Sequence, residues 1–183
     1  VWRGKEAKSA SRGGGSEAAT ITINGTVNGE AGTDGDYIDD AGTTVTSGDG
    51  KMSITGNTIG NTTSDHGIQI GDGGMVSSTG TALVTLMGTS VDGDGIALFD
   101  TVTLITSLNG PLSLTGISDT YGVSIQTGAD VTSTGSATIT VNGTVNSATG
   151  KDGVYIEDSG TTITSVTGDI SITGNTIGSV DAN

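Results

Sequence analysis

The chain of 183 residues has no cysteine, one proline, one histidine and five aromatic residues. A globular core of this length usually includes more aromatic side chains, so a conventional globular fold is not expected. Only 6 Lys and Arg residues stand against 20 Asp and Glu residues, and the net charge is -14. This balance makes nucleic acid a poor partner, because phosphate binding needs a basic surface. No apolar run is long enough to cross a membrane. The absence of cysteine leaves the redox compartment open.

The residues that are abundant favour short strands and tight turns. The chain has 33 glycines and is 32% hydrophobic, and threonine, serine and asparagine fill most of the other positions. β-Branched residues favour strands, whereas Gly, Asn and Ser favour turns. A disordered chain is the alternative, but charged residues make up only 14% of the sequence and the β-branched residues are regularly spaced.

An internal repeat dominates the sequence. The octapeptide SITGNTIG occurs at Ser53–Gly60 and again at Ser171–Gly178. Residues 19–65 align with residues 137–183 at a constant offset of 118, with 29 identities in 47 positions. Within this unit a strand-like run ending in glycine recurs six times, at intervals of 27 to 32 residues. The six glycines are Gly25, Gly56, Gly88, Gly116, Gly143 and Gly174.

Two further short runs follow the first one in each complete period, for example GDYID and then TTVTS in residues 35–47. Three strand-like runs per period of about 30 residues are typical of a parallel β-solenoid. We therefore predict an all-β, right-handed parallel β-helix with three short strands per coil and about six coils of 27–32 residues. It would occupy residues 19–183, with a four-coil super-repeat of 118 residues. A β-sandwich would not require the same three strand types in a fixed order.

Alternation predicts which side chains form the core. The residues two and four positions before each of the six glycines are all apolar, so we expect them to point inward. Ile54 and Ile172 are equivalent members of this set. The second run should bury Ile38, Ile70, Leu98, Ile125 and Ile156, and the third should bury Val45, Val76, Ile105, Val131 and Ile163.

Residues 1–18 match none of the coils and have a net charge of +2, whereas the remainder of the chain has a net charge of -16. We interpret them as a cap, a linker or a basic arm. In the last case the cations Arg3, Lys5, Lys8 and Arg12 would dock on the acidic body of a neighbouring copy. The last coil stops in mid-coil at Asn183 with no polar cap, and an open parallel edge favours pairing with another chain.

Runs such as GTTITSVTGDISITGNTIG and DGVYIEDSG resemble the repeats of filamentous-haemagglutinin-like adhesins, and also the large Gly/Thr-rich β-strand-repeat surface proteins of Gram-negative bacteria. The resemblance covers residues 19–183. It implies an elongated, secreted protein of the cell surface with a non-enzymatic role in adhesion or matrix building.

Acidic residues recur at one corner of the predicted coils. Asp40, Asp72, Asp100 and Asp158 follow the second run, and Asp39 lies next to the first of them. Stacked carboxylates repel, and a Ca²⁺ ion with oxygen ligands would offset that repulsion. The alternative, which we favour, is that each Asp accepts backbone N–H bonds in its own turn. No cofactor is expected to be required.

The outward positions of the first run form a hydroxyl-rich face that includes Thr22, Asn24, Thr115, Thr140, Asn142 and Thr173. Such a face could bind glycan or ice, although Met87 interrupts the pattern. Tyr37 and Tyr155 should project outward at equivalent positions. The single histidine, His66, gives no basis for a catalytic triad, so we expect no enzymatic activity.

These patterns predict an extracellular structural and adhesive rod that assembles head to tail with copies of itself. Surface glycans are the second class of expected partner, and neither nucleic acid nor membrane insertion is expected. The alternative function is a monomeric module that binds glycan or ice.

Overall fold

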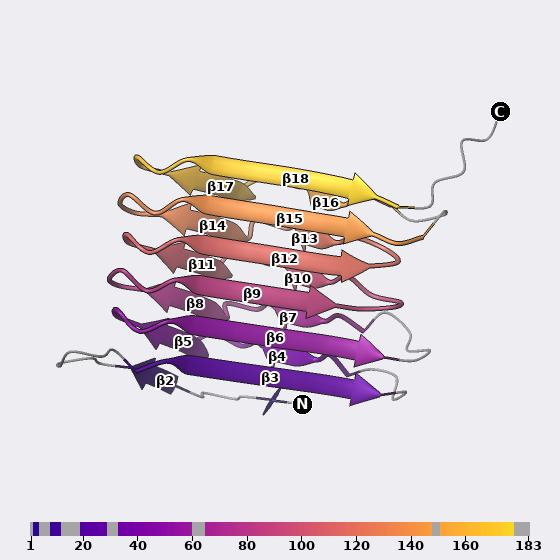
Figure 1. Ribbon diagram of the computed structural model, residues 1–183, viewed down its shortest axis with the longest axis horizontal. Coiled ribbons are helices and arrows are strands. Elements are labelled where there is room, and N and C mark those ends of the chain that lie inside the picture. Colours follow the sequence, from indigo (N-terminus) through magenta and orange to yellow (C-terminus); the bar gives the residue numbers. More distant parts are fainter. Residues whose placement is uncertain are drawn as a thin grey trace.

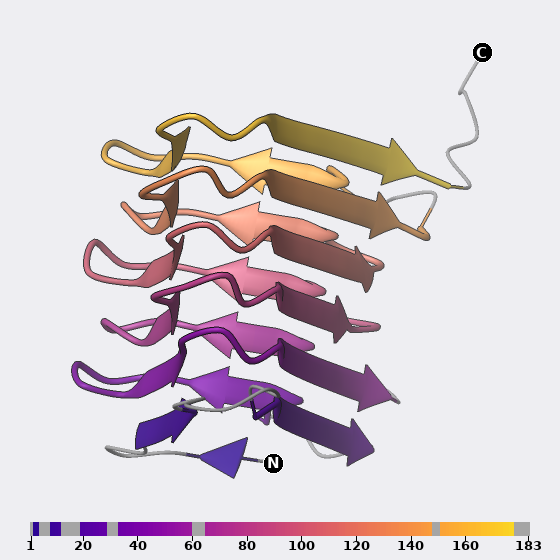
Figure 2. The same ribbon diagram turned by 60° about the vertical axis from the view of Figure 1, so that its left-hand side comes forward.

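The computed structural model describes residues 2–3, 8–11, 19–28, 33–59, 65–147 and 151–177, which form three parallel sheets of six strands each and no helix. The strands lie in layers, one coil above another, from the first coil at the bottom to the last at the top (Figure 1). Turning the molecule by 60° brings the short strands at the side of each coil into view (Figure 2). The prediction of a parallel β-solenoid with three strands per coil is therefore confirmed, with about five complete turns.

Each sheet collects one strand from every coil. Sheet C holds the longest strands, which are β3 (Ile21–Asn28), β6 (Met52–Ile59), β9 (Val84–Thr89), β12 (Leu112–Ser118), β15 (Ile139–Val145) and β18 (Ile170–Thr176). Sheet A holds β1 (Trp2–Arg3), β4 (Asp36–Ile38), β7 (Ile68–Ile70), β10 (Ile96–Leu98), β13 (Val123–Ile125) and β16 (Val154–Ile156). Sheet B holds β2 (Lys8–Ser11), β5 (Thr44–Ser47), β8 (Met75–Ser78), β11 (Leu104–Ser107), β14 (Asp130–Ser133) and β17 (Thr162–Ser165).

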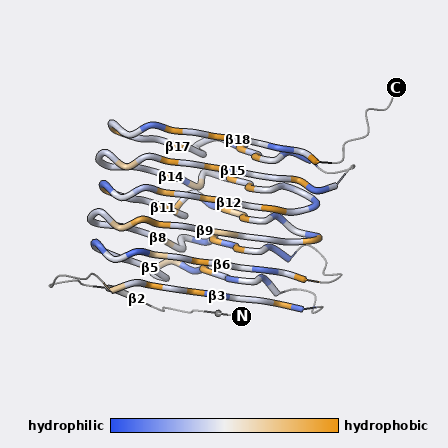
Figure 3. Tube along the Cα trace, in the orientation of Figure 1, coloured by the Kyte–Doolittle hydropathy of each residue, from blue (hydrophilic) through white to orange (hydrophobic). Residues whose placement is uncertain are grey.

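The core is a stack of aliphatic side chains inside the coils. Ile54, Leu86, Leu114 and Val141 are fully buried and follow one another in register through sheet C. Apolar and polar residues alternate along these strands, as the hydropathy of the chain trace shows (Figure 3). The expected core positions of the last coil differ, because no described strand covers them: Ile156, Ile170 and Ile172 are exposed.

The glycine that recurs in every sheet C strand marks a close approach between backbones. A Cβ atom on Gly56 would lie 1.9 Å from the carbonyl oxygen of Gly67, and one on Gly88 would lie 1.9 Å from that of Gly95. Any other residue at these positions would force two backbone segments apart. The close approach between sheets C and A therefore explains why these glycines recur at the coil period.

A serine at the end of the sheet B strands fixes the next turn. The Ser47 hydroxyl donates to the carbonyl oxygen of Gly50 at 2.5 Å, and the Ser107 hydroxyl donates to that of Gly110 at 2.6 Å. Both serines are fully buried, so these bonds satisfy polar groups that would otherwise be costly inside the solenoid.

The amino-terminal residues differ from the sequence prediction that residues 1–18 match no coil. β1 pairs with β4, and β2 pairs with β5, both in parallel. These stretches lack the apolar alternation of the other strands, so pattern analysis missed them, and backbone pairing joins them to the stack. One signal was present: Ser11 occupies the register position of Ser47, the serine that ends each sheet B strand.

Candidate functional site

The acidic residues of the corner lie at positions that require an unusual backbone conformation. Asp40, Asp72, Asp100 and Asp158 have φ angles of 72°, 46°, 79° and 77°. The same position in the remaining complete coil is Thr127, with φ of 52°. Among residues with a side chain, Asp and Asn tolerate this left-handed region best. The need to turn the chain therefore accounts for the recurrence of Asp at this corner.

These side chains also join one coil to the next. The backbone N–H of Asp72 donates to the Asp100 carboxylate at 3.2 Å, and that of Asp100 donates to the Thr127 hydroxyl at 2.8 Å. The N–H of Thr127 in turn donates to the Asp158 carboxylate at 3.1 Å. The corner is therefore a ladder in which the side chains of Asp100, Thr127 and Asp158 each accept a hydrogen bond from the backbone of the preceding coil. The turn interpretation instead predicts these hydrogen bonds within each residue's own turn.

The remaining candidate calcium ligand, Asp39, is turned toward a neighbouring tyrosine. Tyr37 donates its hydroxyl to Asp39 Oδ2 at 2.6 Å, and burial together with this bond raises the pKa of Tyr37 above its ordinary value. A hydrogen bond with Asp100 and the charge of Asp39 raise the pKa of Asp72. Among the described residues, no group of three or more His, Cys, Asp or Glu side chains is arranged to hold a metal ion. Calcium binding at this corner stays a prediction.

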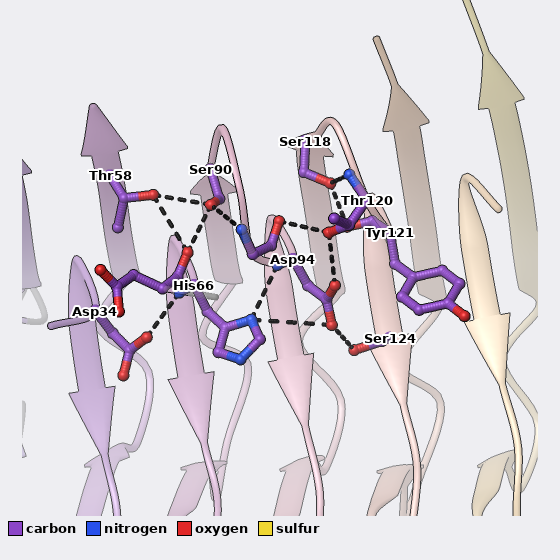
Figure 4. A network of polar contacts seen from close by, with 11 residues as sticks. Asp34, Thr58, His66, Ser90, Asp94, Ser118, Thr120, Tyr121 and Ser124 are labelled. Carbon is purple, nitrogen blue, oxygen red and sulfur yellow. Dashed lines mark hydrogen bonds and ion pairs between the residues drawn. The ribbon is translucent and has the colours of Figure 1, made fainter. Parts of the chain in front are cut away.

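A second polar network lies at the corner between sheets C and A (Figure 4). The His66 backbone N–H donates to Asp34 Oδ1 at 2.7 Å, and the Asp94 N–H donates to His66 Nδ1 at 2.9 Å. Asp94, which is largely buried, also accepts hydrogen bonds from the hydroxyls of Thr120 and Ser124. The network thus links four successive coils. Asp34, His66 and Asp94 occupy equivalent positions in three of them.

This network brings a serine, a histidine and an aspartate together, but not in the order that a catalytic triad requires. The Ser124 hydroxyl donates to Asp94 at 2.5 Å. His66 Nδ1 already accepts the Asp94 N–H and lies 3.9 Å from the Asp94 carboxylate. A triad needs the histidine to accept the proton of the serine. The geometry is that of hydrogen bonds that join coils.

Aromatic side chains gather near the last coil. The rings of Tyr121 and Tyr155 stack with centroids 4.4 Å apart and planes at 15°, and Lys151 Nζ lies 4.6 Å from the Tyr121 centroid. Tyr155 donates its hydroxyl to Glu157, and this bond raises the pKa of Tyr155 to about 12. Tyr155 and the equivalent Tyr37 are both half-buried.

The hydroxyl-rich face lies on the outer side of sheet C. Thr22, Asn24 and Thr173 are exposed, and Thr115, Thr140 and Asn142 are half-buried between neighbouring strands. Their strands pair in register, so the side chains form columns along the rod. Met87 interrupts one column with 48% of its surface exposed, and the exposed Ile117 interrupts the next.

The basic residues assigned to an assembly arm are only partly within the described residues. Arg3 ends β1 and Lys8 begins β2, so the backbone of both belongs to the first coil. Lys5 and Arg12 lie outside the described residues.

The uncovered end of the last described coil exposes apolar side chains that are buried in the other coils. β16, β17 and β18 are the terminal strands of sheets A, B and C. Ile156, Ile170 and Ile172 on this side are 42%, 41% and 46% exposed. The equivalent residues 118 positions earlier are Ile38, Met52 and Ile54, which are buried under the following coil. We refer to the surface formed by β16, β17 and β18 as the open coil face.

Sequence reasoning missed two features of the structure. One is the first coil, with its short strands β1 and β2. The other is Asp36, a buried carboxylate at a position where the next coils have aliphatic residues. The aligned residue Val154 was the available signal, since it shows that this position belongs to the core.

Searches of protein-family models, curated proteins and solved structures find no match to this chain. The fold alone therefore defines its class, a parallel β-solenoid. No helix in the described part of the chain is long and apolar enough to span a membrane.

Proposed function

We propose that this protein is an extracellular structural and adhesive β-solenoid that assembles head to tail into filaments at a cell surface or in a biofilm matrix, and that it is not an enzyme. The observation that carries the proposal is the open coil face. Its strands repeat β4, β5 and β6 at an offset of 118 residues, and those three strands are covered by β7, β8 and β9. The open coil face thus has the sequence of a surface that accepts another parallel coil.

Backbone chemistry supports the same conclusion. An edge strand offers unpaired N–H and C=O groups to an incoming strand. In the interior of the rod such groups pair across coils, as in the bond from the Met52 N–H to the Leu83 carbonyl oxygen at 2.9 Å. At the other end, β1, β2 and β3 are the terminal strands of the three sheets. A second copy can therefore continue all three sheets, and contacts between unlike ends give open filaments rather than closed rings.

The resemblance to the Gly/Thr-rich repeats of bacterial surface adhesins supports an extracellular location. A structural role is also supported by the two polar corner networks, because their hydrogen bonds join successive coils and stiffen the solenoid. Glycan or ice binding by the outer side of sheet C is the alternative. It is less favoured because Met87 and Ile117 interrupt the columns of hydroxyl and amide groups.

The test is electron microscopy of the purified chain together with sedimentation over a range of concentrations. We expect filaments for the unchanged chain and short rods for Ile172→Lys, which places a charge on the open coil face. Thr173→Lys is the matched control, since it adds the same charge to the outward side of the same strand and should leave filaments intact. Monomeric rods at every concentration of the unchanged chain would contradict assembly and lead to glycan- and ice-binding assays.

Filaments that shorten in a calcium chelator would add a metal site at the acidic corner. Filaments of unchanged length in the chelator would mean that the acidic corner needs no metal ion for assembly.

A further inference from the structure

The strands of sheet C are uncharged. None of the six strands that the structure describes in this sheet contains a charged residue, although the chain has a net charge of -14. The other two sheets differ, since sheet A contains Arg3 and Asp36 and sheet B contains Lys8 and Asp130. Two copies of this acidic chain can therefore bring their sheet C faces together without opposing like charges on the strands.

Apolar side chains lie at the middle of the outer side of this sheet. Met87 of β9 and Ile117 of β12 are 48% and 36% exposed. Leu83 and Pro111 directly precede the same two strands and are exposed as well. β9 and β12 are the third and fourth of the six strands, so they lie halfway along the stack (Figure 1). We refer to Leu83, Met87, Pro111 and Ile117 as the apolar centre of sheet C.

In the neighbouring coils the positions of Met87 and Ile117 are polar. Met87 pairs in register with Thr55 of β6 and with Thr115 of β12. Ile117 pairs with Thr89 of β9 and with Thr144 of β15. All four residues of the apolar centre lie in residues 66–136, the part of the chain that is not duplicated. The apolar centre is therefore a local feature of two coils and does not follow from the repeat.

We propose that the outer side of sheet C is a lateral interface through which two copies of the chain pair side by side, with the apolar centre of one copy packed against that of the other. Because β9 and β12 lie at the middle of the stack, a twofold axis through the centre of the sheet overlays the two faces and buries both apolar centres. An apolar centre surrounded by Thr, Ser and Asn has the core and polar rim of a protein interface. A glycan or an ice surface would instead need the hydroxyl columns that Met87 and Ile117 interrupt.

The size of the face suits a pair of this kind. Six strands spaced about 4.8 Å apart and about 23 Å long cover about 650 Å². Two such faces together bury about 1,300 Å², which falls within the range of about 1,200–2,000 Å² for specific interfaces. Sheets packed face to face lie about 10 Å apart, a distance that Met, Leu and Ile side chains fill.

The test uses Ile172→Lys as its background, because this change places a charge on the open coil face and blocks contacts between the ends of the rods. Sedimentation equilibrium of the variant should show a dimer that forms with rising concentration. Adding Met87→Lys should raise the dissociation constant at least about tenfold, because it buries an unpaired charge at the centre of each face.

Two further variants make the result specific. Adding Thr106→Lys is the matched control, since Thr106 is half-buried on the outer side of β11 in sheet B and the same charge there should leave the dimer unchanged. Adding Met87→Thr together with Ile117→Thr gives these positions the polar residue of their neighbours and should weaken the dimer without adding charge. Circular dichroism checks that every variant is folded.

Salt separates this interface from docking by opposite charges. Because the copies repel one another and the strands offer no ion pairs, raising the salt concentration from about 0.05 M to about 0.5 M should tighten the dimer about threefold or more. An Ile172→Lys variant that stays monomeric at every concentration would overturn the proposal. A dimer unaffected by Met87→Lys, or one that salt weakens, would also overturn it.

The lateral interface and the open coil face are different surfaces, so lateral pairing does not depend on head-to-tail assembly. Monomers of Ile172→Lys together with filaments of the unchanged chain would remove lateral pairing alone. Dimers of both chains without filaments would remove head-to-tail assembly alone.

Discussion

The two copies of the internal repeat have the same sequence in two different environments. β6 and β18 share the residues SITGNT, yet every second residue of β6 is buried whereas all of β18 is exposed. Ile54 has none of its surface exposed and the equivalent Ile172 has 46% exposed. Local sequence sets strand formation and side-chain direction in both copies. Burial is set by the next coil, which covers β6 and is not among the described residues above β18.

The comparison shows where the stability of a solenoid lies. A single coil cannot enclose its own apolar side chains, so the interface between coils supplies most of the favourable free energy. Identical residues should then contribute unequally to stability, according to their place in the stack.

The largest expected difference is between Ile54→Ala and Ile172→Ala. Removing a fully buried isoleucine side chain should lower the free energy of unfolding by about 2–5 kcal/mol. The same change at Ile172 should cost about 1 kcal/mol or less, because much of that side chain already contacts water. Urea unfolding followed by circular dichroism measures both, at a concentration where the chain is monomeric.

Equal losses of unfolding free energy in the two variants would contradict the expected difference, since they would mean that the open coil face is covered in solution. If the loss of unfolding free energy in Ile172→Ala grows with protein concentration, a second copy of the chain covers the open coil face.

A smaller difference is expected between Gly56→Ala and Gly174→Ala. A methyl group on Gly56 would meet the Gly67 carbonyl oxygen at 1.9 Å, so two backbones must separate, and we expect a loss of about 3 kcal/mol. On Gly174 the nearest atom is the Val154 backbone nitrogen at 3.2 Å, and the expected change is below about 1 kcal/mol. Thermal unfolding of the two variants measures the difference. A similar loss in both would show that the glycine is needed by the strand itself and not by the approach of the next backbone.

The sequence predicted the fold well because the solenoid repeats its physical constraints in every coil. The apolar alternation that ends at Gly56 recurs in five other runs. The strand assignment therefore rests on six equivalent runs and does not depend on a chance pattern in any one of them. The corner acids lie at positions of positive φ, which Asp tolerates, as at Asp40 and Asp158. The sequence did not show that the hydrogen bonds accepted at this corner come from the preceding coil.

Features that depend on contacts between distant residues could not be predicted in the same way. β1 and β2 have no apolar alternation, and only pairing with β4 and β5 defines them as strands. The bond between Ser124 and Asp94 joins residues 30 positions apart through a loop whose length varies between coils. The identity of a partner at the open coil face is not encoded in the face alone, because any parallel coil of matching shape would satisfy its backbone groups.

The smallest expected effect concerns a corner, where stability should be local and independent of the stack. The turn at residues 126–129 has positive φ at both Thr127 and Gly128, and the Ala129 N–H donates to the Gln126 carbonyl oxygen at 3.1 Å. A β-branched residue is strained in this conformation, whereas Asn-Gly is the preferred pair for such a turn. Thr127→Asn should therefore raise the free energy of unfolding by about 0.5–1 kcal/mol in urea unfolding, because an Asn side-chain oxygen can also replace the hydroxyl that accepts the Asp100 N–H. Asp72→Asn in the equivalent turn of another coil is the control and should change little, since Asp already suits a positive φ there. A loss of stability in Thr127→Asn would mean that the Thr127 hydroxyl, and with it the ladder between coils, outweighs the strain of the turn.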